Sequence, residues 1–198
     1  METCKKYKLT DEYITIGNKK LYRIEALKDF ASIKKGEKGG FVESENNLSQ
    51  NGNCWVYKNA KVFENAKVFD NAGIFENAQV YVNAKIYGNA EVYGNAEVYG
   101  YAEVYGDAKV YGDAKVFGEA MVKGNATISN CSDYIVFKNW WSSGRYFTWT
   151  RSNNMWKVGC FYGTGEELIA KAYKDSELSG REYEKAVKYV ESILKDSK

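Results

Sequence analysis

Residues 86–117 read IYGNAEVYGNAEVYGYAEVYGDAKVYGDAKVF, and this stretch decides the fold because it repeats every six residues. A valine or isoleucine stands at every sixth position from Val56 to Ile128, and an alanine does so from Ala60 to Ala126. A period of six is a multiple of the two-residue period of a strand, and it produces no helical stripe at 3.6 residues. Recurring glycines would also weaken a helix. The segment therefore predicts short strands.

The order of an aliphatic, four further residues and a small residue resembles the hexapeptide repeat of left-handed β-helix proteins. In that family three hexapeptides form one triangular coil of eighteen residues. The resemblance implies that each residue lies beside the residue eighteen positions later, in parallel strands about 4.8 Å apart. Charges in the outward position before each aliphatic should then alternate in sign. The pairs that this register predicts are Lys85 with Glu103, Glu91 with Lys109, and Glu97 with Lys115.

The position after each aliphatic carries a tyrosine or phenylalanine from Tyr57 to Phe117. In a β-helix these rings point outward and form three ladders. Two interpretations stay open: the stacked rings shield one another, or a ladder forms an interface. The left-handed β-helix proteins that the repeat resembles typically form trimers. Together with the ladders, this resemblance favours a homo-oligomer, and a trimer is preferred to a dimer.

The chain divides into three predicted segments, which are residues 1–49, 50–130 and 131–198. The first is a β-rich cap with strands at Tyr13–Ile16 and Leu21–Ile24, separated by Gly17-Asn18. The second is the repeat. The third is a small α+β module with three strands at 134–138, 145–150 and 155–161. Two helices follow, because capping boxes begin at Thr164 and Ser179 and predict helices to about residues 173 and 194. The predicted fold class is thus mainly β.

Composition excludes several kinds of chemistry. The chain contains no histidine, so an imidazole general base or metal ligand is absent from its sequence. The four cysteines are far apart and form no CxxC pair, which argues against a zinc site and a dense disulfide framework; they are expected to be reduced, partly buried thiols and are Cys4, Cys54, Cys131 and Cys160. We predict no catalytic residue, cofactor or metal.

Charge and hydropathy bear on partners and location. The net charge of +2 is too small to predict nucleic-acid binding. The N-terminus lacks the apolar run of a signal peptide, and no stretch has the length of a membrane-spanning helix, so no membrane partner is expected. These features predict a cytoplasmic protein of a bacterial cell.

The scaffold resembles that of bacterial hexapeptide acyltransferases, which place a catalytic histidine at a subunit interface; this sequence offers none. The whole chain is similar to hexapeptide-repeat proteins of Firmicutes and their phages, often labelled transferases. That resemblance rests on Leu21-Tyr22-Arg23-Ile24, on Gly39-Gly40, on the NAxVYG repeats and on the segment 159–167, which reads GCFYGTGEE. It assigns no catalytic residue.

The stretch from Tyr134 to Tyr162 contains four cationic residues and no acidic residue, together with four of the five tryptophans. Cations interleaved with aromatic rings suit a planar anionic ligand, because rings stack on a base and arginine binds phosphate oxygens. The candidate ligand-binding residues are Arg145, Trp149, Arg151, Trp156, Lys157, Trp140 and Trp141. Strand alternation puts Arg145, Trp149 and Arg151 on one face. The alternative is that Trp149 and Trp156 form the core of the module.

These observations favour a non-enzymatic binding protein. Its most concrete form is a phage-type counter-defence protein that sequesters a nucleotide-like signalling molecule. The alternatives are a structural or assembly protein, an inhibitor that binds a host protein through the aromatic ladders, and a hexapeptide-type transferase.

Overall fold

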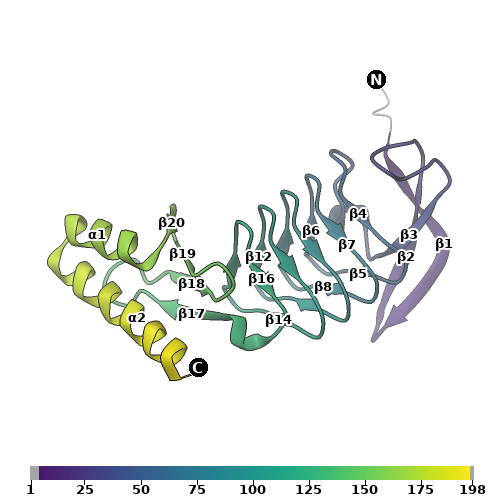
Figure 1. Ribbon diagram of the computed structural model, residues 1–198. Coiled ribbons are helices and arrows are strands. Elements are labelled where there is room, and N and C mark those ends of the chain that lie inside the picture. The colour runs from purple at the N-terminus through teal and green to yellow at the C-terminus, as the bar shows by residue number, and fades with distance from the viewer. Residues whose placement is uncertain (1–4, 197–198) are drawn as a thin grey trace.

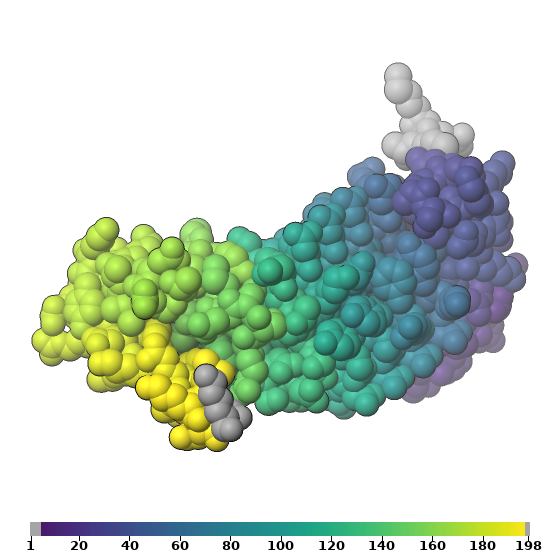
Figure 2. All heavy atoms as spheres, viewed as in Figure 1, coloured from purple at the N-terminus to yellow at the C-terminus, as the bar shows by residue number. Residues whose placement is uncertain are grey.

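The structure is a computed structural model that describes residues 5–196. The molecule is elongated: an N-terminal β cap, a parallel β-solenoid and a C-terminal α+β module follow one another along one axis (Figure 1). The space-filling view shows the three segments in the same order along the molecule (Figure 2). The mainly β fold with a left-handed solenoid is as predicted. Cys4 lies outside the described residues.

The N-terminal cap is a hairpin that continues one sheet of the solenoid. Strands β1 (Tyr7–Ile16) and β2 (Lys19–Ala26) are antiparallel around Gly17, whose φ is +58°. Strand β3 (Lys38–Val42) pairs antiparallel with β2 and parallel with β5, so the cap covers the open edge of the first coil. Both predicted strands are therefore confirmed, and they are longer than the sequence indicated.

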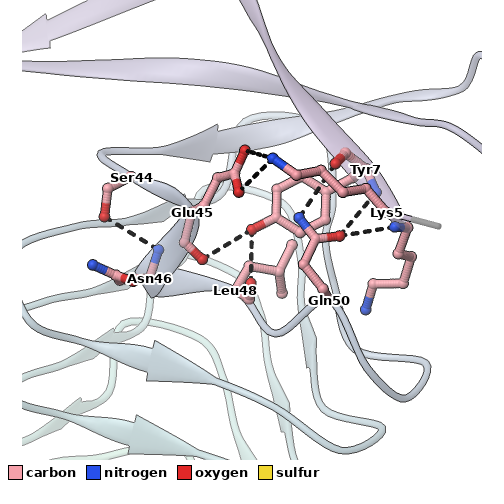
Figure 3. A network of polar contacts seen from close by, with 8 residues as sticks. Lys5, Tyr7, Ser44, Glu45, Asn46, Leu48 and Gln50 are labelled. Atoms are coloured by element: carbon pink, nitrogen blue, oxygen red, sulfur yellow. Dashed lines mark hydrogen bonds and ion pairs between the residues drawn. The ribbon is translucent and has the colours of Figure 1, made fainter. Parts of the chain in front are cut away.

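The cap is attached to the short 3-10 helix Glu45–Asn47 by polar contacts of Tyr7 (Figure 3). The Tyr7 hydroxyl donates to the carbonyl of Leu48 at 2.7 Å, and its ring meets Trp55 edge-on. Burial raises the pKa of Tyr7, since the phenolate would be poorly solvated there. The ammonium of Lys6 is also buried and donates to the carbonyl of Cys54 at 2.9 Å. These contacts close the N-terminal end of the solenoid.

The solenoid consists of two-residue strands joined by turns, three strands to a coil. In chain order they are β4 (Trp55–Val56), β5 (Lys61–Val62), β6 (Lys67–Val68), β7 (Gly73–Ile74), β8 (Gln79–Val80), β9 (Lys85–Ile86), β10 (Glu91–Val92), β11 (Glu97–Val98), β12 (Glu103–Val104), β13 (Lys109–Val110), β14 (Lys115–Val116), β15 (Met121–Val122) and β16 (Thr127–Ile128). They form three parallel sheets, which we call face 1 (β5, β8, β11, β14), face 2 (β4, β7, β10, β13, β16) and face 3 (β6, β9, β12, β15).

The eighteen-residue register is confirmed by the charge pairs. Glu103 lies beside Lys85, Glu91 beside Lys109 and Glu97 beside Lys115, each in register. The corresponding ion pairs measure 2.9, 2.8 and 3.0 Å. The aliphatic and alanine side chains of the repeat are buried inside the prism, as predicted.

The corners of the coils require left-handed backbone, which glycine adopts without strain. In the first coils this position is occupied instead by non-glycine residues with φ between 46° and 65°, namely Lys58, Glu64, Asp70, Glu76 and Val82. Three of them compensate through their carboxylates, which accept the backbone N–H of the residue eighteen positions later; these pairs are Glu64 with Val82, Asp70 with Gly88 and Glu76 with Gly94. Lys58 and Val82 have no such group.

The C-terminal module begins after the 3-10 helix Cys131–Asp133 and contains an antiparallel sheet and two helices. The strands are β17 (Tyr134–Lys138), β18 (Tyr146–Thr150), β19 (Met155–Val158) and β20 (Phe161–Gly163), and the helices are α1 (Gly165–Asp175) and α2 (Glu177–Asp196). The prediction of three strands was wrong: the third breaks at Gly159, which has a φ of +53°, and the chain returns as β20.

One helix start was predicted correctly and the other was not. Thr164 caps α1 and forms the expected capping box with Glu167. Helix α2 begins at Glu177, before the predicted Ser179, because the hydroxyl of Ser176 accepts the N–H of Ser179 at 3.1 Å. The two helices cover one face of the sheet, and Figure 1 shows both at the far end of the molecule from the cap.

Candidate functional site

Two of the candidate stacking residues are core residues. Trp149 and Trp156 are 0% and 1% exposed, and they pack with Phe147 and the apolar faces of α1 and α2. The Trp149 indole N–H donates to Asn154 at 2.8 Å. The structure therefore supports the alternative reading of these two rings, and neither presents a face to a ligand. The predicted alternation is confirmed, since Phe147 and Trp149 face the helices and Thr148 faces the solenoid, where its hydroxyl accepts the N–H of Met121 at 2.9 Å.

The remaining tryptophans lie in the loop between β17 and β18. Trp141 packs edge-on against Tyr183 with ring centroids 4.9 Å apart, so it extends the core of the module. Trp140 is 69% exposed and touches Trp141 edge-on at 6.0 Å. Of the four candidate tryptophans, Trp140 is the one that offers a ring to solvent.

The two candidate arginines flank β18 at opposite ends. Arg145 precedes the strand and Arg151 follows it, so their Cα atoms are about 20 Å apart at roughly 3.3 Å per residue. They share a face by alternation, but Trp149 between them is buried. Arg151 is half-buried, and its Nε atom lies out of solvent without a hydrogen-bond partner among the described residues. One small ligand would not contact both guanidinium groups, so the structure does not bring these three residues together as a site.

Arg145 instead lines a cavity of about 590 Å³ where the last coils of the solenoid meet the C-terminal sheet. We call this cavity the junction hollow; its lining residues are Tyr101, Glu103, Glu119, Met121, Gly144, Arg145, Tyr146, Gly159 and Cys160. Tyr101 is 62% exposed and Tyr146 is 38% exposed, so both rings are available to a ligand. The hollow therefore combines a guanidinium with two accessible aromatic rings.

The loop that carries Arg145 is held by a buried asparagine. The Asn139 side chain donates to the Tyr183 hydroxyl at 2.9 Å and accepts the N–H of Ser142 at 3.0 Å. Its backbone N–H donates to the Arg145 carbonyl, and its carbonyl accepts from Gly144, both at 2.8 Å. Because these bonds fix the loop at both ends, the backbone at Arg145 is defined while its side chain stays exposed. The guanidinium has no ion-pair partner among residues 5–196.

The charges around the hollow are mixed. Burial lowers the pKa of Lys157, and the neighbouring Lys123 lowers it further. Lys157 does not line the cavity but lies next to Gly159, which does. The Lys157 ammonium donates to the Gly159 carbonyl. Glu103 is neutralised by Lys85 at 2.9 Å and also accepts from Tyr87. Glu119 is exposed and has no ion pair in the described part of the chain, so it is the acidic group that a ligand would meet.

Sequence reasoning found Arg145 and missed Tyr101 and Glu119. A signal was present, because the corner position before each repeat alanine carries Asn or Asp in the neighbouring repeats. On this corner Asn65 and Asn83 are hydrogen-bonded to each other, and the next two coils carry Tyr101 and Glu119 in their place. These two residues are eighteen positions apart, so they lie on successive coils. The departure from the repeat marks the hollow.

The cysteines differ from the expectation of partly buried thiols. Cys54 is buried, but Cys131 and Cys160 are exposed. The expectation of a partly buried thiol was wrong for Cys160, because the turn between β19 and β20 directs it into the junction hollow. Within residues 5–196, no cluster of acidic and cysteine side chains is arranged to hold a metal ion, and no helix is long and apolar enough to cross a membrane.

Comparison with known proteins yields one partial likeness. No family model matches the chain. A stretch of 61 residues is 39% identical to an uncharacterized acetyltransferase, YdcK, of Escherichia coli strain K12. The match covers 27% of this chain and 19% of that protein, so the chain spans about a fifth of the length of this relative. The likeness agrees with a hexapeptide-repeat β-helix that resembles transferase-like proteins.

Proposed function

We propose that this chain is a non-enzymatic binding protein that takes up a planar anionic ligand of the nucleotide type in the junction hollow. The observation that carries the proposal is the placement of an ion-pair-free Arg145 beside the accessible rings of Tyr101 and Tyr146. Arginine binds phosphate oxygens through two parallel hydrogen bonds, and each stacked ring contributes about 1–3 kcal/mol per base. A nucleotide presents both partners in one molecule.

The volume and the anchoring of the hollow agree with this ligand class. A cavity of about 590 Å³ lies within the range of small-molecule sites, roughly 300–1,000 Å³. The Asn139 contacts hold the Arg145 loop in place before a ligand arrives, which lowers the ordering cost of binding. Glu119 opposes a fully anionic ligand and favours one that also carries a hydrogen-bond donor, as a nucleobase amino group does.

Binding without turnover is proposed because the chain has no histidine. The Escherichia coli relative is an uncharacterized acetyltransferase, and the shared region covers about a fifth of that protein. A transferase would need a general base within hydrogen-bond reach of its acceptor. The phage-type setting, in which the protein removes a nucleotide signal from a bacterial host, is the context that the resemblance to phage hexapeptide proteins suggests.

The direct test is calorimetry with a panel of mononucleotides and dinucleotides at one fixed salt concentration. Arg145→Ala should weaken the best ligand by about 1.5–3 kcal/mol, the range for charge-assisted hydrogen bonds. Glu119→Gln should reduce the preference for a ligand with a hydrogen-bond donor over a fully anionic one. Arg181→Ala is the matched control, because Arg181 is an exposed arginine on α2 that pairs with Glu177. Equal binding by the wild type and Arg145→Ala would refute the site.

A second candidate function is self-association through the ladders. Face 1 ends in Phe117, which borders a cavity of about 470 Å³ with mostly apolar walls that include Ile135 and Val136. This arrangement favours contact between copies, and a trimer is the preferred assembly. Light scattering that shows a monomer at micromolar concentration would remove this candidate.

A further inference from the structure

The three aromatic ladders of the solenoid are not equivalent. On face 1 the rings of Phe63, Tyr81, Tyr99 and Phe117 stack continuously at 5.0–5.3 Å. On face 3 Phe69, Tyr87 and Tyr105 stack at 4.7 Å. Face 2 has two separate stacks, Tyr57 on Phe75 and Tyr93 on Tyr111, and among the described residues no ring contact joins Phe75 to Tyr93. The ladder on face 2 is interrupted between these two rings.

The interruption has a cause in the sequence. Gly73 occupies the outward position before an aliphatic, where the neighbouring strands on the other faces carry Lys67 and Gln79. A Cβ at Gly73 would overlap the Phe75 ring, so this ring lies over the glycine in space that a side chain would otherwise fill. Phe75 stacks closely on Tyr57, at 4.3 Å, and leaves Tyr93 without its neighbour.

The gap is a cavity of about 420 Å³ lined by Tyr57, Lys58, Phe75, Glu76, Glu91 and Tyr93. Two of its polar groups are already engaged: Glu76 accepts the N–H of Gly94 at 2.8 Å, and Glu91 pairs through Oε2 with Lys109 at 2.8 Å. The second carboxylate oxygen of Glu91 has no partner in the part of the chain that the structure describes.

The other faces show what Glu91 lacks. On face 1 Glu97 pairs with Lys115 and also accepts the Tyr81 hydroxyl at 2.7 Å. On face 3 Glu103 pairs with Lys85 and also accepts the Tyr87 hydroxyl at 3.0 Å. In both cases the tyrosine stands sixteen residues before the glutamate. The residue sixteen before Glu91 is Phe75, which has the ring and not the hydroxyl.

We propose that the gap on face 2 is a binding site for a planar aromatic ring that carries a hydrogen-bond donor, such as a phenol. The ring would lie between Phe75 and Tyr93, and its hydroxyl would donate to the free oxygen of Glu91. The ligand thereby supplies the contact that Tyr81 and Tyr87 supply from within the chain on the other two faces. The site is independent of the junction hollow.

The test uses p-cresol, the side chain of tyrosine, as the probe in ligand-observed NMR with the full chain. We expect saturable binding, and toluene should bind about tenfold more weakly because it lacks the donor, a difference of roughly 1.4 kcal/mol. Phe75→Tyr should abolish p-cresol binding, since the new hydroxyl reaches Glu91. Gly73→Gln should abolish it by filling the gap, and Gln79 shows that this side chain fits the equivalent position.

Tyr81→Phe is the matched control, because it frees the Glu97 oxygen within an unbroken ladder and should create no second site. Circular dichroism and thermal melting establish that each variant is folded. The proposal is overturned if p-cresol binds Phe75→Tyr and Gly73→Gln with the same affinity as the wild type. It is also overturned if toluene binds the wild type as tightly as p-cresol does, or if no binding occurs at millimolar probe. The phenol could come from a small molecule or from a tyrosine of a second copy of the chain, and sedimentation distinguishes the two. If the wild type does not bind p-cresol and Gly73→Gln changes the oligomeric state, the occupant is a tyrosine of a second copy and the small-molecule site is rejected.

Discussion

The solenoid and the C-terminal module have cores of opposite kinds. The solenoid interior is built from valine, isoleucine and alanine side chains that repeat along three faces. The module instead depends on a few large rings, with Phe147, Trp149, Trp156 and Tyr183 packed against two helices. Stability is therefore spread over many small equal contributions in one region and concentrated in a few side chains in the other.

The difference has a consequence for function. A coil can depart from the repeat at one outward position and keep its neighbours, because each repeat contacts mainly the next coil along the axis. Tyr101 and Gly73 are such departures: Tyr101 lines the junction hollow, and Gly73 lies under the ring of Phe75, which lines the gap on face 2. The module cannot vary in this way where its rings meet, and its exposed candidate residue, Arg145, lies in a loop.

The largest effect is expected for a ring in the module. Trp156→Ala should lower the free energy of unfolding by about 3–5 kcal/mol, because it removes a fully buried ring from a core with few members. Urea denaturation followed by far-ultraviolet circular dichroism measures this loss. Trp140→Ala is the control, since an exposed ring should change the same quantity by less than about 0.5 kcal/mol. A loss below 1 kcal/mol for Trp156→Ala would mean that the core assignment is wrong.

A smaller effect is expected for the ladder tyrosine that donates to Glu97. Tyr81→Phe should cost about 1 kcal/mol at neutral pH, because a charge-assisted hydrogen bond of 2.7 Å is lost at a partly exposed site. The Tyr81 hydroxyl and Lys115 hold the pKa of Glu97 below its ordinary value. The stabilisation is therefore present above the ordinary glutamate pKa and is lost as pH falls through the lower folded value.

The stability difference between the wild type and Tyr81→Phe should accordingly shrink below about pH 4. Tyr111→Phe serves as the control, since Tyr111 stacks on Tyr93 and its hydroxyl has no hydrogen bond among residues 5–196. A Tyr81→Phe penalty that stays constant from neutral to acidic pH would contradict the role of Glu97.

A stabilising change is expected at Val82, a left-handed corner residue that has no carboxylate. Val82 is β-branched and has a φ of +65°, a conformation that strains such residues by about 1–3 kcal/mol. Val82→Gly should relieve this strain, offset by the entropy of glycine in the unfolded chain, for a net gain of about 1 kcal/mol. The reverse change on the same corner, Gly100→Val, should destabilise, because a Cβ there would lie 2.8 Å from the Gly118 nitrogen. A lower urea midpoint for Val82→Gly would show that the corner is not strained.

The solenoid could be predicted from sequence almost residue by residue because one rule governs every repeat. The register followed from charges such as Glu91 and Lys109, and the buried and outward positions followed from the period. What escaped prediction were the exceptions. Gly73 stands at an ordinary strand position of the repeat, and nothing in the period indicates that the Phe75 ring lies over it.

The module was harder because its contacts are not periodic. Alternation gave the correct faces of β18, but alternation does not say which face the helices cover, and so Trp149 remained a candidate for both a core and a site. The break at Gly159 depends on one left-handed residue, and the early start of α2 depends on which of two serines, Ser176 or Ser179, accepts the hydrogen bond. Such choices are made by tertiary packing.

The smallest expected effect concerns a pair of like charges on face 3. Lys67 lies directly beside Lys85, which already pairs with Glu103. Lys67→Glu should place an opposite charge beside Lys85 and stabilise the fold by about 0.2–1 kcal/mol, the range for cross-strand pairs. Because the pair is exposed, the gain should decline as salt rises and screening shortens the reach of the charges. Lys61→Glu is the control, since its neighbour across the sheet is the uncharged Gln79. The urea midpoints of both variants are measured at low and at high salt concentration. A stability gain for Lys67→Glu that is equal at the two concentrations, or that Lys61→Glu matches, would exclude a direct effect of the Lys67–Lys85 contact.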